Sequence, residues 1–192
     1  MDAAIIDFGQ EYNIDPGIVQ AILCVENRDL KGLDYMDRPR IRFELHVFEG
    51  RHKASNYGEF FRIGPKRYFD HYYKLGNVES YVHSSQENEH VALSIARVLD
   101  DFAALESIGI GVGQIMGFNY ASVGYESAYD MYFAAFDESN QYKMFTEFLK
   151  TKTGLIAALS SLDYTKITTI YNGTGNIEAY KKKLIECHNK FK

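Results

Sequence analysis

The 192-residue sequence lacks tryptophan, has only two cysteines and contains no apolar run long enough to cross a membrane. Cys24 and Cys187 are far apart in the chain and both fall in helical patterns, so we expect two buried free thiols rather than a disulfide framework. A spanning helix needs about 20 mainly apolar residues, so we expect no insertion into a membrane. The first residues carry neither a positive segment nor a long apolar one, and no cleavable secretion signal is predicted.

The sequence also has no excess of positive charge. Its formal net charge is -5, which argues against sequence-independent binding to nucleic acid, because such binding depends on a cationic surface. Hydrophobic residues make up 46% and charged residues 24% of the chain, as is typical of a globular domain. Since neither a repeat nor a low-complexity linker is visible, residues 1–192 are predicted to form one domain.

The periodicity of apolar residues predicts a mainly α-helical domain with one small β element. Residues 40–45 alternate polar and apolar side chains and are the candidate strand. Residues 57–75 receive no assignment, and residues 107–125 are expected to form a glycine-rich loop with a short helix. The predicted helices cover residues 2–12, 16–26, 89–105, 127–136, 139–151, 154–161, 163–171 and 176–190.

Local signals mark several helix ends. Asp15 and Asp163 are candidate N-caps, and Pro16 fits the first helical position. Gly154 fits the position just after a helix C-terminus. In the long helix predicted over residues 89–105, one side is expected to face the core, and it carries Val91, Ile95, Val98, Phe102 and Leu105.

Glu26 points most directly to chemistry. It closes an apolar run over residues 18–25, in which Ile18, Ala21, Ile22 and Val25 have the spacing of a buried helix face. Burial and the negative end of the helix dipole would both favour the protonated carboxylic acid. Such an acid beside a cleft can protonate a leaving glycosidic oxygen. The alternative is a solvated glutamate at a frayed helix end, and Glu26 alone does not decide between the two.

Two further segments fit the glycosidase interpretation. Residues 111–117 read Gly-Val-Gly-Gln-Ile-Met-Gly, and residues 171–173 read Tyr-Asn-Gly. With residues 25–27, their order resembles the lysozyme-like superfamily of goose-type lysozymes and lytic transglycosylases. In that superfamily a glutamate ends a buried helix, a glycine-rich Gln-Ile segment lines the cleft, and a Tyr-Asn-Gly turn lies opposite.

Within that superfamily, the chain resembles the phage-type N-acetylmuramidases, or endolysins. The similarity is carried by residues 38–48, 104–107, 114–119 and 171–173 and spans about residues 10–185. Two positions depart from the family pattern. The usual Glu-Ser is Glu26-Asn27 here, and residues 109–111 read Gly-Ile-Gly where the family has Ser-Trp-Gly, so one sugar-stacking ring is missing.

The resemblance implies a glycosidase that cleaves the β-1,4 bond between N-acetylmuramic acid and N-acetylglucosamine in peptidoglycan. Glu26 would be the general acid, and Glu44 the second carboxylate across the cleft, where it could orient water, stabilise positive charge or act as nucleophile. The alternative for Glu44 is a structural ion pair with Arg40 or Arg42. The candidate substrate-binding residues are Gly111, Gln114, Met116, Asn119, Tyr171 and Asn172.

No metal or other cofactor is expected. Glu44, His46 and Glu49 are close in sequence but lack the helical spacing that zinc proteases use. Two rival functions stay open: a lytic transglycosylase, which uses the same acid but forms 1,6-anhydro products, and an inactive peptidoglycan-binding structural component.

The expected partner is the glycan strand of peptidoglycan, bound by a monomer without a separate wall-binding domain. Since no secretion signal is predicted, we expect synthesis in the cytoplasm and delivery to the wall by a holin or another partner.

Overall fold

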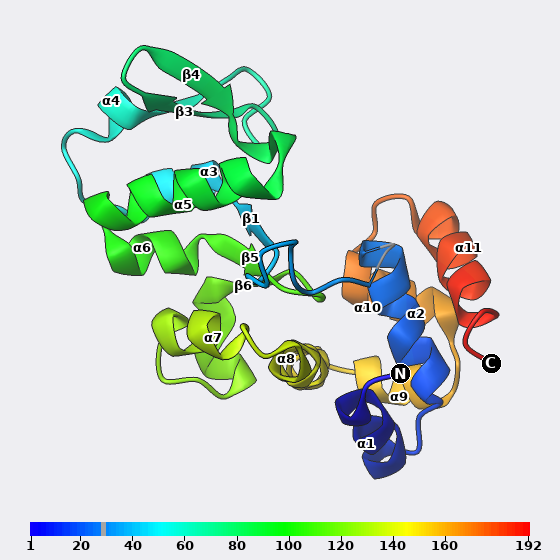
Figure 1. Ribbon diagram of the computed structural model, residues 1–192. Helices are drawn as coiled ribbons and strands as arrows, with labels where there is room; N and C mark the ends of the chain where they lie inside the picture. Colours follow the sequence, from blue (N-terminus) through cyan, green and yellow to red (C-terminus); the bar gives the residue numbers. More distant parts are fainter. Residues whose placement is uncertain (28–29) are drawn as a thin grey trace.

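The computed structural model describes residues 1–27 and 30–192 (Figure 1). Its α-helices are α1 (Ala3–Tyr12), α2 (Pro16–Glu26), α3 (Leu45–Glu49), α4 (Tyr57–Phe60), α5 (Gln86–Leu99), α6 (Asp101–Glu106), α7 (Ala128–Ala134), α8 (Glu138–Lys150), α9 (Leu155–Ser160), α10 (Tyr164–Asn172) and α11 (Ile177–His188). Two 3₁₀ helices are η1 (Val82–Ser84) and η2 (Gly117–Val123). The strands are β1 (Ile41–Phe43), β2 (Phe61–Ile63), β3 (His71–Leu75), β4 (Val78–Tyr81), β5 (Ile108–Ile110) and β6 (Ile115–Met116).

The elements form two groups with α8 between them (Figure 1). One group contains α1, α2, α9, α10 and α11 together with both chain termini, and the other contains the strands with α3 to α7. Both sheets are antiparallel, with strand orders β1-β5-β6 and β2-β3-β4. The mainly helical class is therefore confirmed, with two small sheets instead of the one β element expected.

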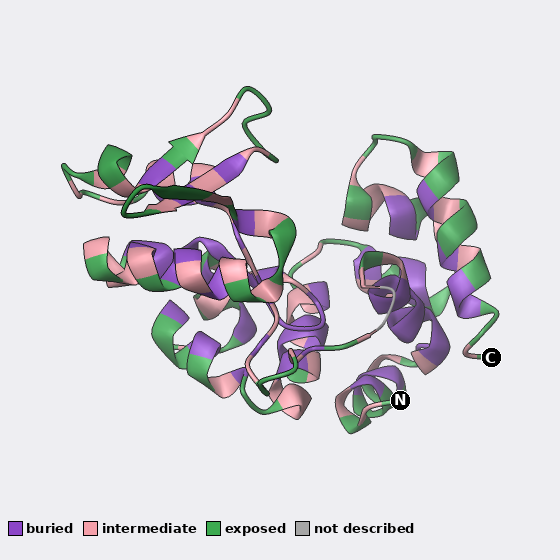
Figure 2. Cartoon of the chain, turned by 45° about the horizontal axis from the view of Figure 1, so that its top comes forward, coloured by how far each residue is buried: buried purple, intermediate pink, exposed green. Residues whose placement is uncertain are grey.

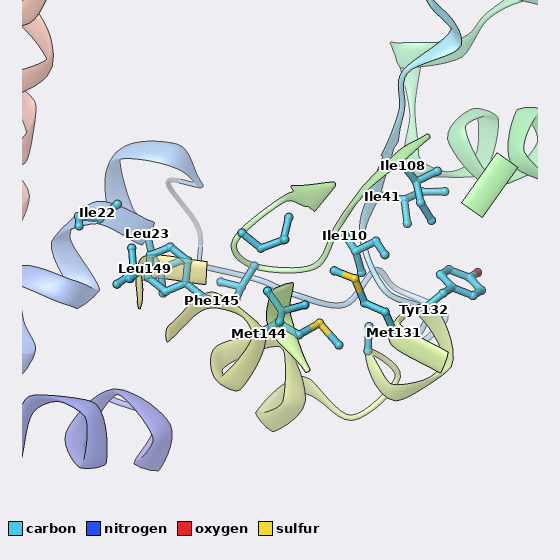
Figure 3. Close-up of a cluster of buried hydrophobic side chains, with 14 of the residues drawn as sticks. Ile22, Leu23, Ile41, Ile108, Ile110, Met131, Tyr132, Met144, Phe145 and Leu149 are labelled. Carbon is cyan, nitrogen blue, oxygen red and sulfur yellow. The ribbon is translucent and has the colours of Figure 1, made fainter. Parts of the chain in front are cut away.

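One continuous core joins the two groups (Figure 3). Leu23 of α2 lies near Phe145 of α8, and the cluster continues to Ile110 of β5. Helix α2 is buried on nearly every side, from Gly17 to Cys24, whereas α5 and α11 bury one face (Figure 2). Because a close-packed interior resists deformation, this core fixes the relative positions of the two groups.

The predicted caps at Asp15 and Asp163 are confirmed. Asp15 accepts a hydrogen bond from the backbone N–H of Gly17 at 2.8 Å, directly before α2. Asp163 accepts one from the backbone N–H of Lys166 at 3.1 Å, before α10. Gly154 has a left-handed φ of +80°, but it directly precedes α9 rather than directly following α8.

The prediction of one long helix over residues 89–105 is wrong. It is divided at Asp100, whose side chain accepts a hydrogen bond from the backbone N–H of Ala103 and so caps the new helix α6. The prediction of which side faces the core is also partly wrong, since Val98 is 87% and Phe102 73% exposed. Helix α5 instead buries a face that carries Glu89, His90, Ala92, Leu93 and Ala96.

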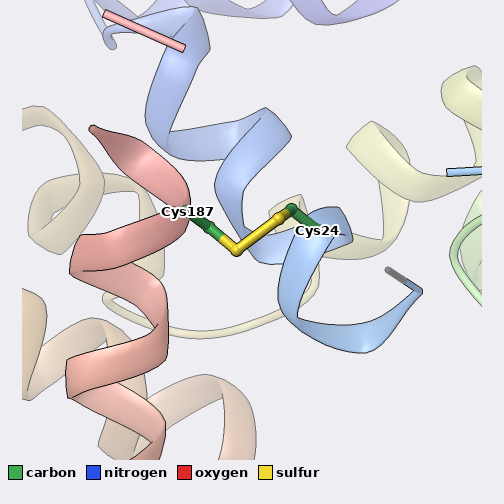
Figure 4. The surroundings of a disulfide bond; sticks show 2 residues. All are labelled: Cys24 and Cys187. Atoms are coloured by element: carbon green, nitrogen blue, oxygen red, sulfur yellow. A yellow bond between two sulfur atoms is a disulfide. The ribbon is translucent and has the colours of Figure 1, made fainter. Parts of the chain in front are cut away.

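The prediction of two free thiols is wrong as well. Cys24 and Cys187 form a disulfide that joins α2 to α11 (Figure 4). The two helices pack side by side and place the Cα atoms 6.1 Å apart, a separation that suits a disulfide. Sequence spacing alone carried no sign of this tertiary contact.

The segment left without an assignment, residues 57–75, forms α4, β2 and β3. The expected loop at residues 107–125 contains strands β5 and β6 before its 3₁₀ helix η2. In the part of the chain that the structure describes, we find no helix long and apolar enough to cross a bilayer.

Candidate active site

Glu26 is the last residue of α2, at the point where this buried helix leaves the core. Cys24 is buried, Val25 is half-buried and Glu26 is exposed. The burial expected from the apolar run is therefore wrong for Glu26, because the last turn projects out of the packed interior. The carboxyl group is open to solvent at the C-terminal end of a rigid helix.

A buried tyrosine hydroxyl holds the Glu26 carboxyl group. Tyr180 of α11 donates a hydrogen bond from its hydroxyl to Oε1 of Glu26 at 2.7 Å, and only 9% of Tyr180 is exposed. Burial, together with the negative charge of Glu26, raises the pKa of Tyr180 above its ordinary value. Tyr180 therefore stays a neutral donor. Because Oε1 accepts this bond, Oε2 is the carboxyl oxygen left for other partners.

Tyr171, at the end of α10, is the second tyrosine near Glu26. Its pKa is also raised, first by burial and then by the charge of Glu26. Tyr171 of the Tyr-Asn-Gly segment therefore lies close enough to Glu26 to sense its charge. Tyr180, nine residues later, was not predicted, since nothing in its local sequence links it to Glu26.

Glu26 borders a pocket of about 420 Å³, which we call the acid pocket. Gln114 lies in its lining, with a left-handed φ of +48°. Its Nε2 donates to the backbone carbonyl of Gly111 at 2.8 Å, so part of the Gln114 amide braces its own turn. The acid pocket is lined by Glu26, Asn27, Arg40, Ile41, Arg42, His83, Gln86, Glu89 and Gln114.

Glu44 lines a neighbouring hollow of about 770 Å³, which we call the aromatic hollow. Arg42 and His83 line both spaces. The aromatic hollow is lined by Arg42, Glu44, His46, Val47, Tyr68, Phe69, Tyr81, His83, Met116 and Phe118.

The ion pair considered from sequence is formed, because Nε of Arg42 donates to Oε1 of Glu44 at 2.7 Å. The other carboxylate oxygen of Glu44 lies 3.4 Å from Nδ1 of His46. Glu44 thus lies beside the acid pocket and is not part of the lining around Glu26. Its carboxylate has Arg42 and His46 as neighbours.

The other predicted binding residues have different positions. Met116 lines the aromatic hollow. Gly111 is buried with a φ of +68°, and a Cβ atom there would collide with the Gln141 side chain, so its glycine is explained by packing and backbone conformation. Asn119, in η2, and Asn172, exposed at the end of α10, are absent from the described linings of both spaces.

A cluster of possible metal ligands lies at the aromatic hollow. Among the described residues, Glu44, His46 and His71 have ligand atoms within 4.8 Å of one another. Glu49, which the sequence offered as a third member, instead pairs with Arg67 at 2.7 Å. Both ring nitrogens of His71 are engaged, since Nε2 lies 2.9 Å from the Arg67 carbonyl and Nδ1 contacts another histidine. His71 is therefore held by hydrogen bonds, whereas Nδ1 of His46 has no hydrogen-bond partner among the described residues.

The second histidine is His83, and it belongs to a buried chain of polar groups. Nε2 of His83 lies 2.7 Å from Nδ1 of His71, and Nδ1 of His83 lies 2.7 Å from Oε1 of Glu89. Burial lowers the pKa of His71 to about 4 and raises that of Glu89. A neutral His71 that donates to the Arg67 carbonyl must accept from His83. The hydrogen bonds among His71, His83 and Glu89 support the wall between the acid pocket and the aromatic hollow.

Comparison with known proteins relates this chain to a protein family and to a solved structure. The N-acetylmuramidase family model matches residues 15–192. The crystal structure of the Burkholderia AP3 phage endolysin matches with a TM-score of 0.75 and 24% identity, over 100% of this chain and 71% of that chain. At this identity the second match is a similarity of fold. No curated protein matches the chain.

Proposed function

The chain belongs to the N-acetylmuramidase family of glycosidases that act on peptidoglycan, and on that basis we propose that Glu26 is the general acid of the reaction. The bond we assign is the β-1,4 linkage between N-acetylmuramic acid and N-acetylglucosamine. One observation carries the proposal: the Glu26 carboxyl group borders a pocket at the end of a rigid helix, with Oε1 held by the buried Tyr180 hydroxyl.

In the proposed reaction, Oε2 of Glu26 gives its proton to the glycosidic oxygen as the bond to the anomeric carbon breaks. Positive charge develops on the sugar ring in the transition state. A water molecule then attacks the anomeric carbon and transfers its proton to a carboxylate. We assign the orientation of this water to Glu44, which Arg42 holds in place through the 2.7 Å hydrogen bond.

The second candidate is a lytic transglycosylase. It is favoured by the position of Glu44, which is paired with Arg42 and lines the neighbouring aromatic hollow instead of the acid pocket. In this mechanism the C6 hydroxyl of the sugar attacks in place of water and closes a 1,6-anhydro ring. The acid remains Glu26, so the two candidates differ in the nucleophile.

We also propose that the chain acts as an endolysin, as a monomeric catalytic unit on glycan strands. This is supported by its similarity in fold to a protein described as a phage endolysin. An endolysin made in the cytoplasm reaches the wall with the help of a delivery partner, for which a holin is our candidate.

The test is Glu26→Gln. The amide is nearly isosteric but donates no acidic proton, and general acid catalysis typically contributes about 10²–10⁴-fold. We expect lysis of purified bacterial walls, followed by turbidity, to fall by at least about 10²-fold, with an unchanged circular dichroism spectrum. Glu126→Gln is the matched control, because Glu126 is exposed and absent from both pocket linings.

A further inference from the structure

The aromatic hollow collects exposed rings from three separate parts of the chain. Tyr68 is 62% and Phe69 60% exposed, and both lie in the loop between β2 and β3. Tyr81 ends β4 and is 37% exposed, and Phe118 in η2 is 41% exposed. Clustered exposed apolar surface on a protein commonly marks a binding site.

These rings are held before any ligand arrives. The Tyr81 hydroxyl donates a hydrogen bond to the backbone carbonyl of Phe69 at 2.9 Å, and this bond links the loop to β4. The Tyr68 ring stands edge-on to His46, with centroids 4.9 Å apart. The Arg51 guanidinium lies 4.9 Å from the centre of the Phe118 ring. A pre-organised site loses less conformational entropy on binding.

The hollow also carries charged and polar groups among its rings. Glu44 and Arg42 form their ion pair there, and Nδ1 of His46 is buried without a hydrogen-bond partner among the described residues. Ring faces suit the C–H faces of a sugar, while the carboxylate, guanidinium and imidazole suit its hydroxyl and acetamido groups. A purely apolar ligand would leave Nδ1 of His46 without a partner.

The hollow adjoins the acid pocket, since Arg42 and His83 line both. A linear polymer that places one linkage at Glu26 would therefore extend along this wall. From these observations we propose that the aromatic hollow is a glycan subsite that binds further sugar units of the same strand. The inference rests on the proposed function. It would supply ring stacking in a chain that contains no tryptophan.

The test measures binding without turnover, by titration calorimetry in the Glu26→Gln background. The probe is a peptide-free octasaccharide of alternating N-acetylglucosamine and N-acetylmuramic acid. Tyr68→Ala and Phe118→Ala should each weaken its binding about three- to tenfold, the range expected for one aromatic contact. Tyr68→Phe should restore binding, because it keeps the ring. The control is Phe133→Ala, since Phe133 is 44% exposed on α7 and outside the hollow.

Unchanged octasaccharide affinity in both alanine variants would overturn the proposal. It would also be overturned if the variants weakened binding of the isolated stem peptide and not of the glycan. Unfolding is monitored by circular dichroism for each variant. Failure of the proposed function would be seen separately, as wall lysis by Glu26→Gln in the turbidity assay.

Discussion

The Glu26 side chain would be free to rotate at the end of α2 without the hydrogen bond from Tyr180. That bond, at 2.7 Å, selects one orientation of the carboxyl group and leaves Oε2 to carry the acidic proton. Since a misplaced catalytic group loses much of its effect, we treat Tyr180 as a positioning residue for the acid.

Tyr180→Phe tests this role. The ring is kept and the hydroxyl is lost, so we expect kcat to fall about three- to tenfold, the net value of one hydrogen bond, with little change in KM. Tyr164→Phe is the control, because its hydroxyl bonds His188 at 2.7 Å, away from Glu26. An equal fall in kcat in the two variants would show that the role of Tyr180 is purely structural.

Glu44→Gln separates the two candidate mechanisms. If Glu44 orients the attacking water, its loss should cost at least about 10²-fold in rate, and the residual products should be hydrolytic. If the nucleophile is the C6 hydroxyl of the sugar, activity should remain within a few-fold of the parent and the products should carry an anhydro ring. Because the variant also releases Arg42, its fold is checked by thermal melting.

Residues of the candidate site could be predicted where local sequence fixes their surroundings. Glu26 follows an apolar helix and Gln114 lies in a glycine-rich turn. The resemblance of these segments to the lysozyme-like superfamily implied that both residues lie at the cleft, and both line the acid pocket. Tyr180 and His83 were not predicted, because their partners lie on other elements. The exposure of Glu26 was missed, since periodicity does not show where a helix leaves the core.

At the level of elements, the α2–α11 pair sets the geometry around the acid. Two contacts join the same helices: the Cys24–Cys187 disulfide and the Tyr180–Glu26 hydrogen bond. Tyr180 and Cys187 are seven residues apart on α11, which places them on one helix face. Cys24 lies two residues before Glu26, so the covalent link holds the end of α2 directly.

Replacing both cysteines by serine should lower the free energy of unfolding by about 2–5 kcal/mol, as expected for loss of a native disulfide. The drop would be measured by chemical denaturation of the oxidised parent and the double variant. Reductant should destabilise the parent by a similar amount and leave the variant unchanged. Identical denaturation midpoints for parent and variant, with and without reductant, would contradict a stabilising disulfide.

Most helices could be predicted because their caps and apolar spacing are local. Asp15 and Asp163 capped the expected helices, and the bounds of α7 to α11 lie close to those predicted. The break at Asp100 was missed because Val98 and Phe102 continued an apolar pattern that proved to face solvent. The sheet β2-β3-β4 depends on strand pairing between segments, which the aromatic composition of residues 57–75 does not specify.

For the whole molecule, chelation should leave activity unchanged. The proposed chemistry needs two side-chain carboxyl groups and water, and His71 has both ring nitrogens in hydrogen bonds. Wall lysis should therefore be the same, within error, before and after treatment with EDTA. Loss of activity with EDTA and its return with zinc would instead assign a metal to Glu44, His46 and His71.

The central claim is that this chain cleaves peptidoglycan glycan strands with Glu26 as the acid. Mass spectrometry of the muropeptides released from purified peptidoglycan tests it most directly. We expect the parent protein to release fragments ending in reducing N-acetylmuramic acid, each heavier by one water than the anhydro form, and folded Glu26→Gln to release almost none. Fragments ending in reducing N-acetylglucosamine, or equal release by Glu26→Gln, would contradict it.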